Sequence, residues 1–294
     1  MSSAPLLDRE FLEKLERLTI HCQKSFAGLV GGHNSSRFAG GGQEFLDHRH
    51  FHHGDDLRAV NWRAYMRLEK MFLKMFQIEP RVPVRMLLDT SASMSATSEQ
   101  KFEYACKLAA ALCYVALVRL DTICIQPFGD GLGERFICGG GRHRFSPVMD
   151  YLAQLRTKGR TSFYQSVREF ISRYPQRGLL VVISDFLDDD GCQKALQYLS
   201  DFGHELLLVQ VWSEEDRLPP WTGELELVDA ESGSHVKMQV DGRAREKYTA
   251  AFDQYAENLQ KIAVSNNGRY VGVTTTMALE DVIFGALVRA KGLV

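Results

Sequence analysis

The sequence predicts an α/β fold in which a mostly parallel sheet is covered by helices on both faces. Short apolar runs with the length and composition of buried strands occur at 84–88, 122–127, 134–137, 179–184, 206–212 and 269–273. Helical patterns alternate with these runs at 99–119, 145–156, 163–173, 190–202, 243–264 and 277–290. Such alternation predicts parallel strand pairing, because each helix carries the chain back to the edge where its strand began.

The first of these strands leads into Asp89-Thr90-Ser91-Ala92-Ser93. A carboxylate and two hydroxyls at alternate positions, at the mouth of a buried strand, indicate a cradle for a hard cation. Small residues in the turn let the backbone wrap so that these side chains converge. The alternative is an ordinary loop whose serines cap the next helix.

Two later segments favour the cation site. Gly159-Arg160-Thr161-Ser162 offers a hydroxyl in a loop, and Ile183-Ser184-Asp185-Phe186 places a second carboxylate just past the fourth predicted strand. Here the chain resembles the von Willebrand factor A domain, whose metal-ion-dependent adhesion site is DxSxS followed by a Thr and a later Asp. The resemblance implies five metal ligands, Asp89, Ser91, Ser93, Thr161 and Asp185.

The same resemblance implies a doubly wound sheet, in which the strand before Asp89 and the strand before Asp185 are neighbours. In such sheets the carboxyl ends of these strands form the crevice where ligands bind. Mg²⁺ prefers six oxygen ligands and retains water readily. Three hydroxyls and two carboxylates leave an open coordination position, which a carboxylate from another protein can fill. We expect Mg²⁺ first, with Mn²⁺ or Ca²⁺ as alternatives.

Residues 1–80 are predicted to be an accessory segment that packs on the main domain, residues 81–294. Leu7, Phe11, Leu15, Leu18 and Cys22 form one apolar stripe and predict an amphipathic helix within 6–26. The aromatic residues that follow have too little chain around them to form an independent core.

A second resemblance lies between residues 43 and 80, in the succession Arg49, Phe51, Gly54-Asp55-Asp56, Arg58, Asn61-Trp62, Arg67 and Glu79. It is similar to a bacterial family of uncharacterised von Willebrand A-like proteins, whose members accompany MoxR-type AAA+ ATPases. Read from the residues alone, Asp55, Asp56, Arg58, Arg63 and Arg67 pair among themselves, while Trp62 anchors the segment to the core. A partner surface is the alternative, since Arg and Trp are frequent in binding hot spots. A zinc site on His48, His50 and His52 lacks a further ligand in a recognised spacing.

Residues 213–240 interrupt the alternation of strands and helices. Two runs of alternating polarity surround Glu231-Ser232-Gly233-Ser234 and predict an inserted β-hairpin. It either decorates the edge of the sheet or serves as a docking element.

Composition narrows the classes of partner and compartment. The 294 residues are 45% hydrophobic with a net charge of −2, a balance that argues neither for nucleic acid nor for a membrane surface as a partner. Charged residues interrupt the apolar residues of 1–18, unlike a signal peptide, and the longest apolar run, 108–118, is too short to span a bilayer. We therefore expect a cytoplasmic protein without membrane insertion.

Together these features predict a non-enzymatic interaction protein. By resemblance it works with a MoxR-type AAA+ ATPase in assembling or remodelling client proteins, which supply an acidic residue to the metal. The alternative is a metal-dependent phosphoester hydrolase that uses Asp89 as its nucleophile. That chemistry needs a second carboxylate two residues on, where this chain has Ser91. The motifs GxSxG, HExxH and GxxxxGK[ST] do not occur in the sequence.

Overall fold

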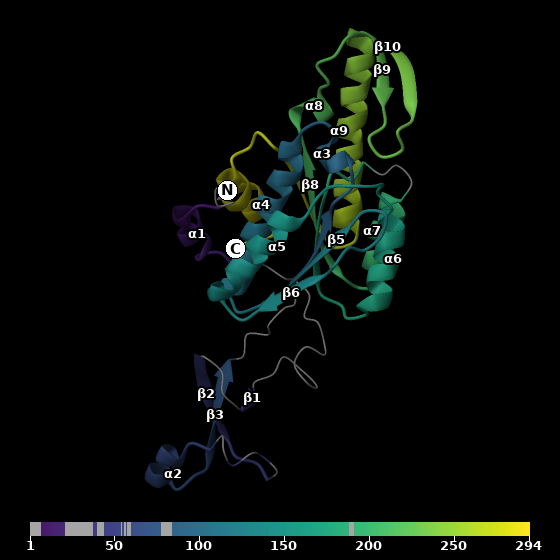
Figure 1. Ribbon diagram of the computed structural model, residues 1–294. Helices are drawn as coiled ribbons and strands as arrows, with labels where there is room; N and C mark the ends of the chain where they lie inside the picture. Colours follow the sequence, from purple (N-terminus) through teal and green to yellow (C-terminus); the bar gives the residue numbers. More distant parts are fainter. Residues whose placement is uncertain are drawn as a thin grey trace. The chain divides into compact units, whose positions relative to one another are not determined.

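The chain divides into two compact units, one formed by residues 1–25 and 82–294 and the other by residues 26–81. The computed structural model describes residues 7–20, 38–39, 44–53, 55, 57, 60–77, 84–187 and 191–294 (Figure 1). Within these ranges, none of the helices combines the length and the hydrophobicity that a membrane span requires.

The described residues of the larger unit form a six-stranded sheet with the order β11-β8-β7-β4-β5-β6. Its strands are β4 (Val84–Asp89), β5 (Thr122–Phe128), β6 (Phe136–Gly139), β7 (Leu179–Ser184), β8 (Glu205–Trp212) and β11 (Arg269–Thr274). β6 is antiparallel to β5, and the other pairs are parallel. β4 and β7 are neighbours, with Leu88 opposite Ile183. The predicted doubly wound, mostly parallel α/β fold is therefore confirmed.

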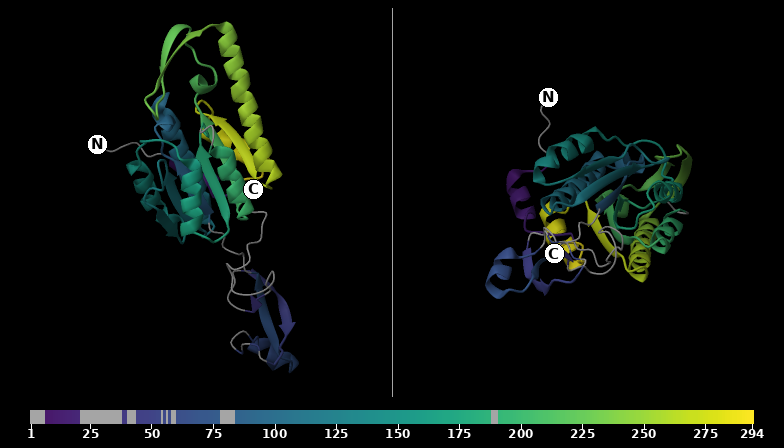
Figure 2. Two further views of the ribbon diagram at one scale, coloured as in Figure 1. Left: turned by 90° about the vertical axis from the view of Figure 1, so that its right-hand side faces the viewer. Right: turned by 90° about the horizontal axis from the view of Figure 1, so that it is seen from below.

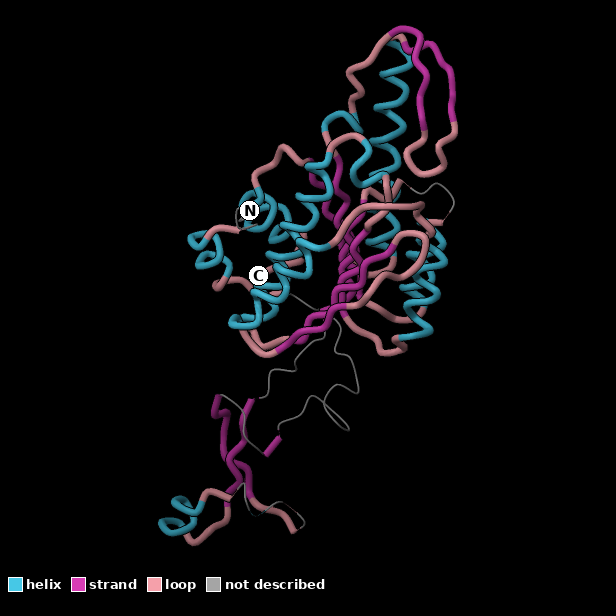
Figure 3. Tube along the Cα trace, viewed as in Figure 1, coloured by secondary structure: helices cyan, strands magenta, loops and turns pink. Residues whose placement is uncertain are grey.

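Helices cover both faces of this sheet (Figure 3). One face packs against α4 (Glu99–Val118), α5 (Phe145–Gln154) and the π-helix η3 (Asp281–Leu287), and the other against α6 (Phe163–Arg173), α7 (Cys192–Asp201) and α9 (Gly242–Ser265). Successive strand residues point to opposite faces, so Met86 and Leu88 enter the α4 core while Leu87 enters the α6 core. This double burial explains why the strands are continuous apolar runs. A 3₁₀ turn, η2 (Arg142–Arg144), precedes α5.

The N-terminal helix α1 (Arg9–Leu15) belongs to the larger unit and is shorter than predicted. It begins where Asp8 Oδ1 accepts a hydrogen bond from the Phe11 N–H (2.7 Å). After Leu15 the chain leaves the helix but keeps Leu18 buried, and Ile20 then forms an antiparallel bridge with Leu293. Cys22 and the rest of the predicted helix lie outside the described residues.

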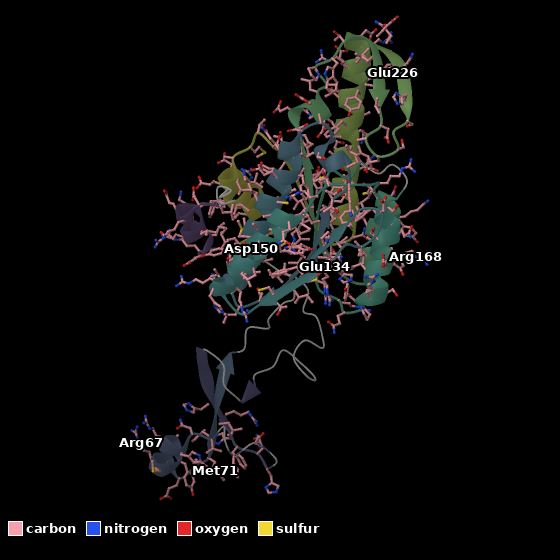
Figure 4. All side chains as sticks on the ribbon, in the orientation of Figure 1. Arg67, Met71, Glu134, Asp150, Arg168 and Glu226 are labelled. Carbon is pink, nitrogen blue, oxygen red and sulfur yellow. The ribbon has the colours of Figure 1, made fainter. Side chains whose placement is uncertain are left out.

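The smaller unit contains an antiparallel sheet of order β1-β3-β2, formed by β1 (Phe38–Ala39), β2 (Glu44–His50) and β3 (Phe72–Gln77). Helix α2 (Trp62–Leu68) lies between β2 and β3 in the chain; Figure 4 labels its Arg67. Asn61 caps it by accepting a hydrogen bond from the Ala64 N–H (3.3 Å). The predicted packing of residues up to 80 on the main domain stays a prediction.

Trp62 is 52% exposed and meets Tyr65 edge-on, and its anchoring of the segment to the main core stays a prediction. One expectation for this segment is corrected. Asp55 pairs with Arg49 (2.8 Å) rather than with an arginine of α2. His48 Nε2 lies 2.7 Å from Asn61 Nδ2.

The predicted hairpin is formed by β9 (Gly223–Val228) and β10 (His235–Val240), after the short helix α8 (Glu214–Arg217). α9 extends beyond the carboxyl ends of the central strands, and the hairpin lies beside its N-terminal part (Figures 1 and 2). The turn between β9 and β10 comes back toward the sheet, at the end where β4 and β7 finish.

Candidate metal centre

Asp89, the last residue of β4, has a fully buried side chain. Its Oδ1 accepts a hydrogen bond from the Ser91 N–H (2.9 Å), and its Oδ2 accepts one from the Ser184 hydroxyl (2.6 Å). These two bonds fix the plane of the carboxylate. Because each carboxylate oxygen has two lone pairs, each retains one for a cation.

The turn after Asp89 brings two predicted ligands together. The hydroxyl oxygens of Ser91 and Ser93 lie 2.9 Å apart, and Ser93 opens the short helix α3 (Ser93–Ala96). Thr90 fastens the turn to β5, since its N–H (2.8 Å) and its hydroxyl (2.9 Å) both donate to the Phe128 carbonyl. Three of the five predicted ligands therefore gather at the end of β4.

The loop before α6, which carries Thr161, is bound to the same turn. The Ala92 N–H donates to the Gly159 carbonyl (3.0 Å), and the Lys158 N–H donates to the Thr90 carbonyl (2.9 Å). Gly159 has a φ of +74°, and a Cβ there would lie 2.3 Å from Asp130 Oδ2. Only glycine fits this position without a shift of the loop.

Thr161 binds a carboxylate from the inserted hairpin. Its hydroxyl donates to Glu231 Oε1 (2.7 Å), and its N–H donates to Glu231 Oε2 (2.8 Å). Glu231 lies in the turn between β9 and β10, 70 residues further along the chain. A predicted metal ligand is thus already in contact with an acidic side chain.

Asp185, the fifth predicted ligand, is buried just past β7 and shares an ammonium group. Its Oδ2 accepts from Lys101 Nζ (2.9 Å), and its Oδ1 accepts from the Leu187 N–H (3.2 Å). Lys101 Nζ also donates to Asp216 Oδ2 (3.1 Å). Burial alone would lower the pKa of Lys101, but the charges of Asp185 and Asp216 raise it, so the ammonium stays protonated.

The electrostatics of the centre favour a cation. Burial, and then the negative charge of Asp185, raise the pKa of Asp89 to about 7, against the hydrogen bonds from Ser184 and Ser91. The two aspartates are therefore close enough to repel each other, and the Lys101 ammonium binds Asp185 and Asp216. A divalent ion beside Asp89 would offset this repulsion. The oxygen-only donor set fits Mg²⁺, Mn²⁺ or Ca²⁺.

The segment after Asp185 adopts a strained backbone. Phe186 is buried and has a φ of +56°, a left-handed conformation that costs a residue other than glycine about 1–2 kcal/mol. Its N–H donates to the Ser184 hydroxyl (2.9 Å), and Gln210 Nε2 holds the Asp185 carbonyl (3.0 Å). A strained backbone of this kind persists only where the surrounding structure holds it in place. It is frequent at functional sites.

Sequence reasoning missed four participants, Ser184, Lys101, Asp216 and Glu231. Lys101 carried a signal, because it stands in the first turn of α4, where the helix dipole disfavours a cation unless carboxylates are near. Asp216 belongs to an S-x-x-D capping pattern with Ser213, which predicts the start of α8 but not the contact with Lys101. The sequence around Ser184 and Glu231 contains no pattern that indicates a role for either residue in the centre.

Within the described parts of the chain, no three His, Cys, Asp or Glu side chains are grouped so that they could hold a metal ion. The centre at the end of β4 has a different donor set, because its predicted ligands are two aspartates and three hydroxyls. The assignment of Asp89, Ser91, Ser93, Thr161 and Asp185 as metal ligands stays a prediction.

Comparison with known proteins gives one family match. The family described as "Protein of unknown function DUF58" matches residues 47–258. Two relatives, uncharacterized protein Rv1480 of Mycobacterium tuberculosis and uncharacterized protein Mb1516 of Mycobacterium bovis, are each 23% identical over 256 residues. The match covers 83% of this chain and 78% of each relative.

Solved structures with a related fold include BatB from Bacteroides thetaiotaomicron, at 16% identity and a TM-score of 0.40, covering 71% of this chain and 98% of that chain. Another is proximal thread matrix protein 1 from the mussel byssus, with a zinc-occupied MIDAS motif, at 10% identity and a TM-score of 0.32. That match covers 45% of this chain and 36% of the mussel chain. Similarities this distant say nothing about the function of this chain.

Proposed function

The chain belongs to the DUF58 family of proteins of unknown function, and from its candidate metal centre we propose that it is a non-enzymatic protein-interaction module. Binding depends on a divalent cation, Mg²⁺ first, with Mn²⁺ or Ca²⁺ as alternatives. The ion is held by Asp89, Ser91, Ser93, Thr161 and Asp185. An acidic residue of a partner protein completes its coordination.

The observation that carries this proposal is the buried carboxylate of Asp89, which lies near the negative charge of Asp185 and accepts hydrogen bonds from the neutral Ser91 N–H and Ser184 hydroxyl. A buried charge is costly unless it is paired or binds a metal. Three of the five proposed ligands are neutral hydroxyls, and the charge of Asp185 is already paired with Lys101, so a bound divalent ion is only partly neutralised and stays electrophilic. Such an ion attracts a further carboxylate, which is the chemistry of adhesion rather than of turnover.

We propose that the partners are a MoxR-type AAA+ ATPase and the client proteins that the ATPase and this chain together assemble or remodel in the cytoplasm. This step rests on the resemblance of residues 49–79. Exposed apolar side chains on α2, Trp62 (52%) and Met66 (76%), are consistent with a second contact surface in the smaller unit.

The alternative, a phosphoester hydrolase with Asp89 as nucleophile, has less support. The Asp89 side chain is fully buried, and both of its oxygens accept hydrogen bonds from within the fold. The hydroxyl of Ser91 also stands where a second carboxylate would act as acid and base.

A binding assay with two purified proteins tests the proposal. The chain is immobilised, and a purified MoxR-type AAA+ ATPase is passed over it in Mg²⁺ and then in EDTA. We expect binding in Mg²⁺ that is lost in EDTA and in Asp89→Ala. Binding that survives both changes contradicts a metal-dependent contact. Turnover of generic phosphoesters that disappears in Asp89→Ala would instead establish the hydrolase.

A further inference from the structure

The contact between Thr161 and Glu231 has the form of a carboxylate-binding subsite. One residue offers both a backbone N–H and a hydroxyl, and the two oxygens of one carboxylate accept them at 2.8 and 2.7 Å. A hydrogen bond to an ionised acceptor is about twice as strong as one between neutral groups. The subsite therefore recognises a carboxylate through one hydrogen bond to each of its two oxygens, and not through charge attraction alone.

The hairpin turn is built to present this carboxylate. Asp229 Oδ1 accepts hydrogen bonds from the N–H groups of Glu231 and Ser232, and the Asp229 N–H donates to the Ser234 carbonyl (2.8 Å). Gly233 has a φ of +66°, which closes the turn. The backbone around Glu231 is thus fixed before it meets Thr161.

Charge complementarity supports the same arrangement. The pKa of Asp229 is lowered chiefly by hydrogen bonds from Ser232, and the positive charge of Arg160 contributes as well. Arg160 therefore lies close enough to influence the acidic turn, while the adjacent Thr161 binds Glu231. An acidic segment of the chain itself therefore lies beside Arg160 and Thr161.

The rest of the hairpin is only lightly held. The cross-strand neighbours Leu227 and Val236 are 40% and 57% exposed, and Val228 at the end of β9 is 57% exposed. A segment with little buried apolar surface opens at low free-energy cost. The turn can therefore leave Thr161 while the central sheet stays intact.

We propose that Thr161 and Arg160 form a subsite for a carboxylate of an acidic partner loop, and that Glu231 occupies this subsite until the partner displaces it. This inference rests on the proposed function, because Thr161 is also one of the proposed metal ligands. It adds that the partner loop resembles the hairpin turn, with one carboxylate held by Thr161 and a second negative charge near Arg160.

Amide hydrogen exchange tests the internal contact without metal or partner. Glu231→Ala should speed the exchange of the Thr161 amide by roughly tenfold or more, because it removes a charged acceptor. Glu226→Ala is the matched control, since it deletes an exposed carboxylate of the same hairpin (Figure 4). Its Thr161 amide should exchange as in the wild type. Unchanged Thr161 exchange in Glu231→Ala, with the hairpin still folded, overturns the internal contact.

A synthetic peptide of residues 227–236 then tests displacement. Its binding is followed by fluorescence anisotropy in Mg²⁺. A tethered segment has an effective concentration of about millimolar, so the wild type should bind the peptide at least roughly tenfold more weakly than Glu231→Ala does. A peptide with Gln at the position of Glu231 should bind neither protein. Equal binding to the wild type and Glu231→Ala, or binding to neither, overturns the proposed displacement.

The two proposals fail in different ways. If calorimetry shows that the wild type binds no Mg²⁺, the metal-dependent function fails, whereas fast Thr161 exchange in Glu231→Ala still supports the subsite. If Mg²⁺ binds but the peptide never discriminates Glu231→Ala from the wild type, the metal centre stands and the displacement is wrong.

Discussion

The buried carboxylate of Asp89 makes the stability of the metal-free protein depend on pH. Its pKa is about 7 in the folded chain, against an ordinary value of 3.8. Since the folded pKa is the higher one, the stabilising contribution of the protonated form is fully present below pH 3.8 and is lost as the pH rises to about 7. At pH 8 this shift of about three pKa units lowers the free energy of unfolding by about 4 kcal/mol, compared with a carboxyl whose pKa is unshifted.

Asp89→Asn removes this charge while keeping the shape of the side chain and an acceptor for the Ser91 N–H. In urea unfolding at pH 8 with EDTA, we expect the variant to be more stable than the wild type by up to about 4 kcal/mol. At pH 5 the difference should fall by more than half, because the wild-type carboxyl is then protonated in the folded state.

Asp216→Asn is the matched control with the opposite sign. Burial would raise the pKa of Asp216, but Lys101 and the Thr97 hydroxyl lower it overall, so its neutralisation should destabilise the protein at pH 8.

Saturating Mg²⁺ should stabilise the wild type by about 2.7 kcal/mol at a concentration of 100 Kd and leave Asp89→Asn unchanged. An Asp89→Asn variant that is less stable than the wild type at pH 8 would refute the reasoning.

Three further predictions concern neighbouring residues. Lys101→Met leaves Asp185 and Asp216 without their ammonium and should lower the unfolding free energy by about 3–5 kcal/mol in urea titration; a loss below about 1 kcal/mol contradicts a buried ion pair. Ser91→Ala and Ser93→Ala should each weaken Mg²⁺ binding in calorimetry less than Asp89→Ala does, because water can replace a neutral ligand; equal losses would show that the charge is not decisive. Arg160→Glu should weaken binding of an acidic partner and flatten its salt dependence in surface plasmon resonance without altering Mg²⁺ affinity; unchanged partner binding removes Arg160 from the interface.

Local patterns predicted most of the fold and part of the centre. The strands of the central sheet were predictable because both faces are buried, which leaves uninterrupted apolar runs such as Leu179–Ser184. Asp89, Ser91 and Ser93 were predictable together because one short turn brings them into contact. The adjacency of β4 and β7 came from a family resemblance, since spacing does not determine strand order.

Contacts between distant segments were beyond sequence reasoning. Glu231 and Thr161 are 70 residues apart, and Lys101 and Asp216 are 115 apart, so their contacts depend on how the hairpin and α8 return to the sheet. The first helix was predicted too long for a related reason. Leu18 is buried and continues the apolar stripe, although the helix ends at Leu15. The chain there pairs with the C-terminal segment through Ile20 and Leu293, a contact that the local sequence does not reveal.

Calorimetric titration of Mg²⁺ into the metal-free protein at pH 8 tests the central claim most directly. The account predicts one Mg²⁺ bound by the wild type, no detectable binding by Asp89→Asn, and wild-type affinity that falls as the pH drops below about 7, where protons compete for Asp89. Wild-type protein that binds no divalent ion, or Asp89→Asn that binds Mg²⁺ as tightly as the wild type, would contradict it.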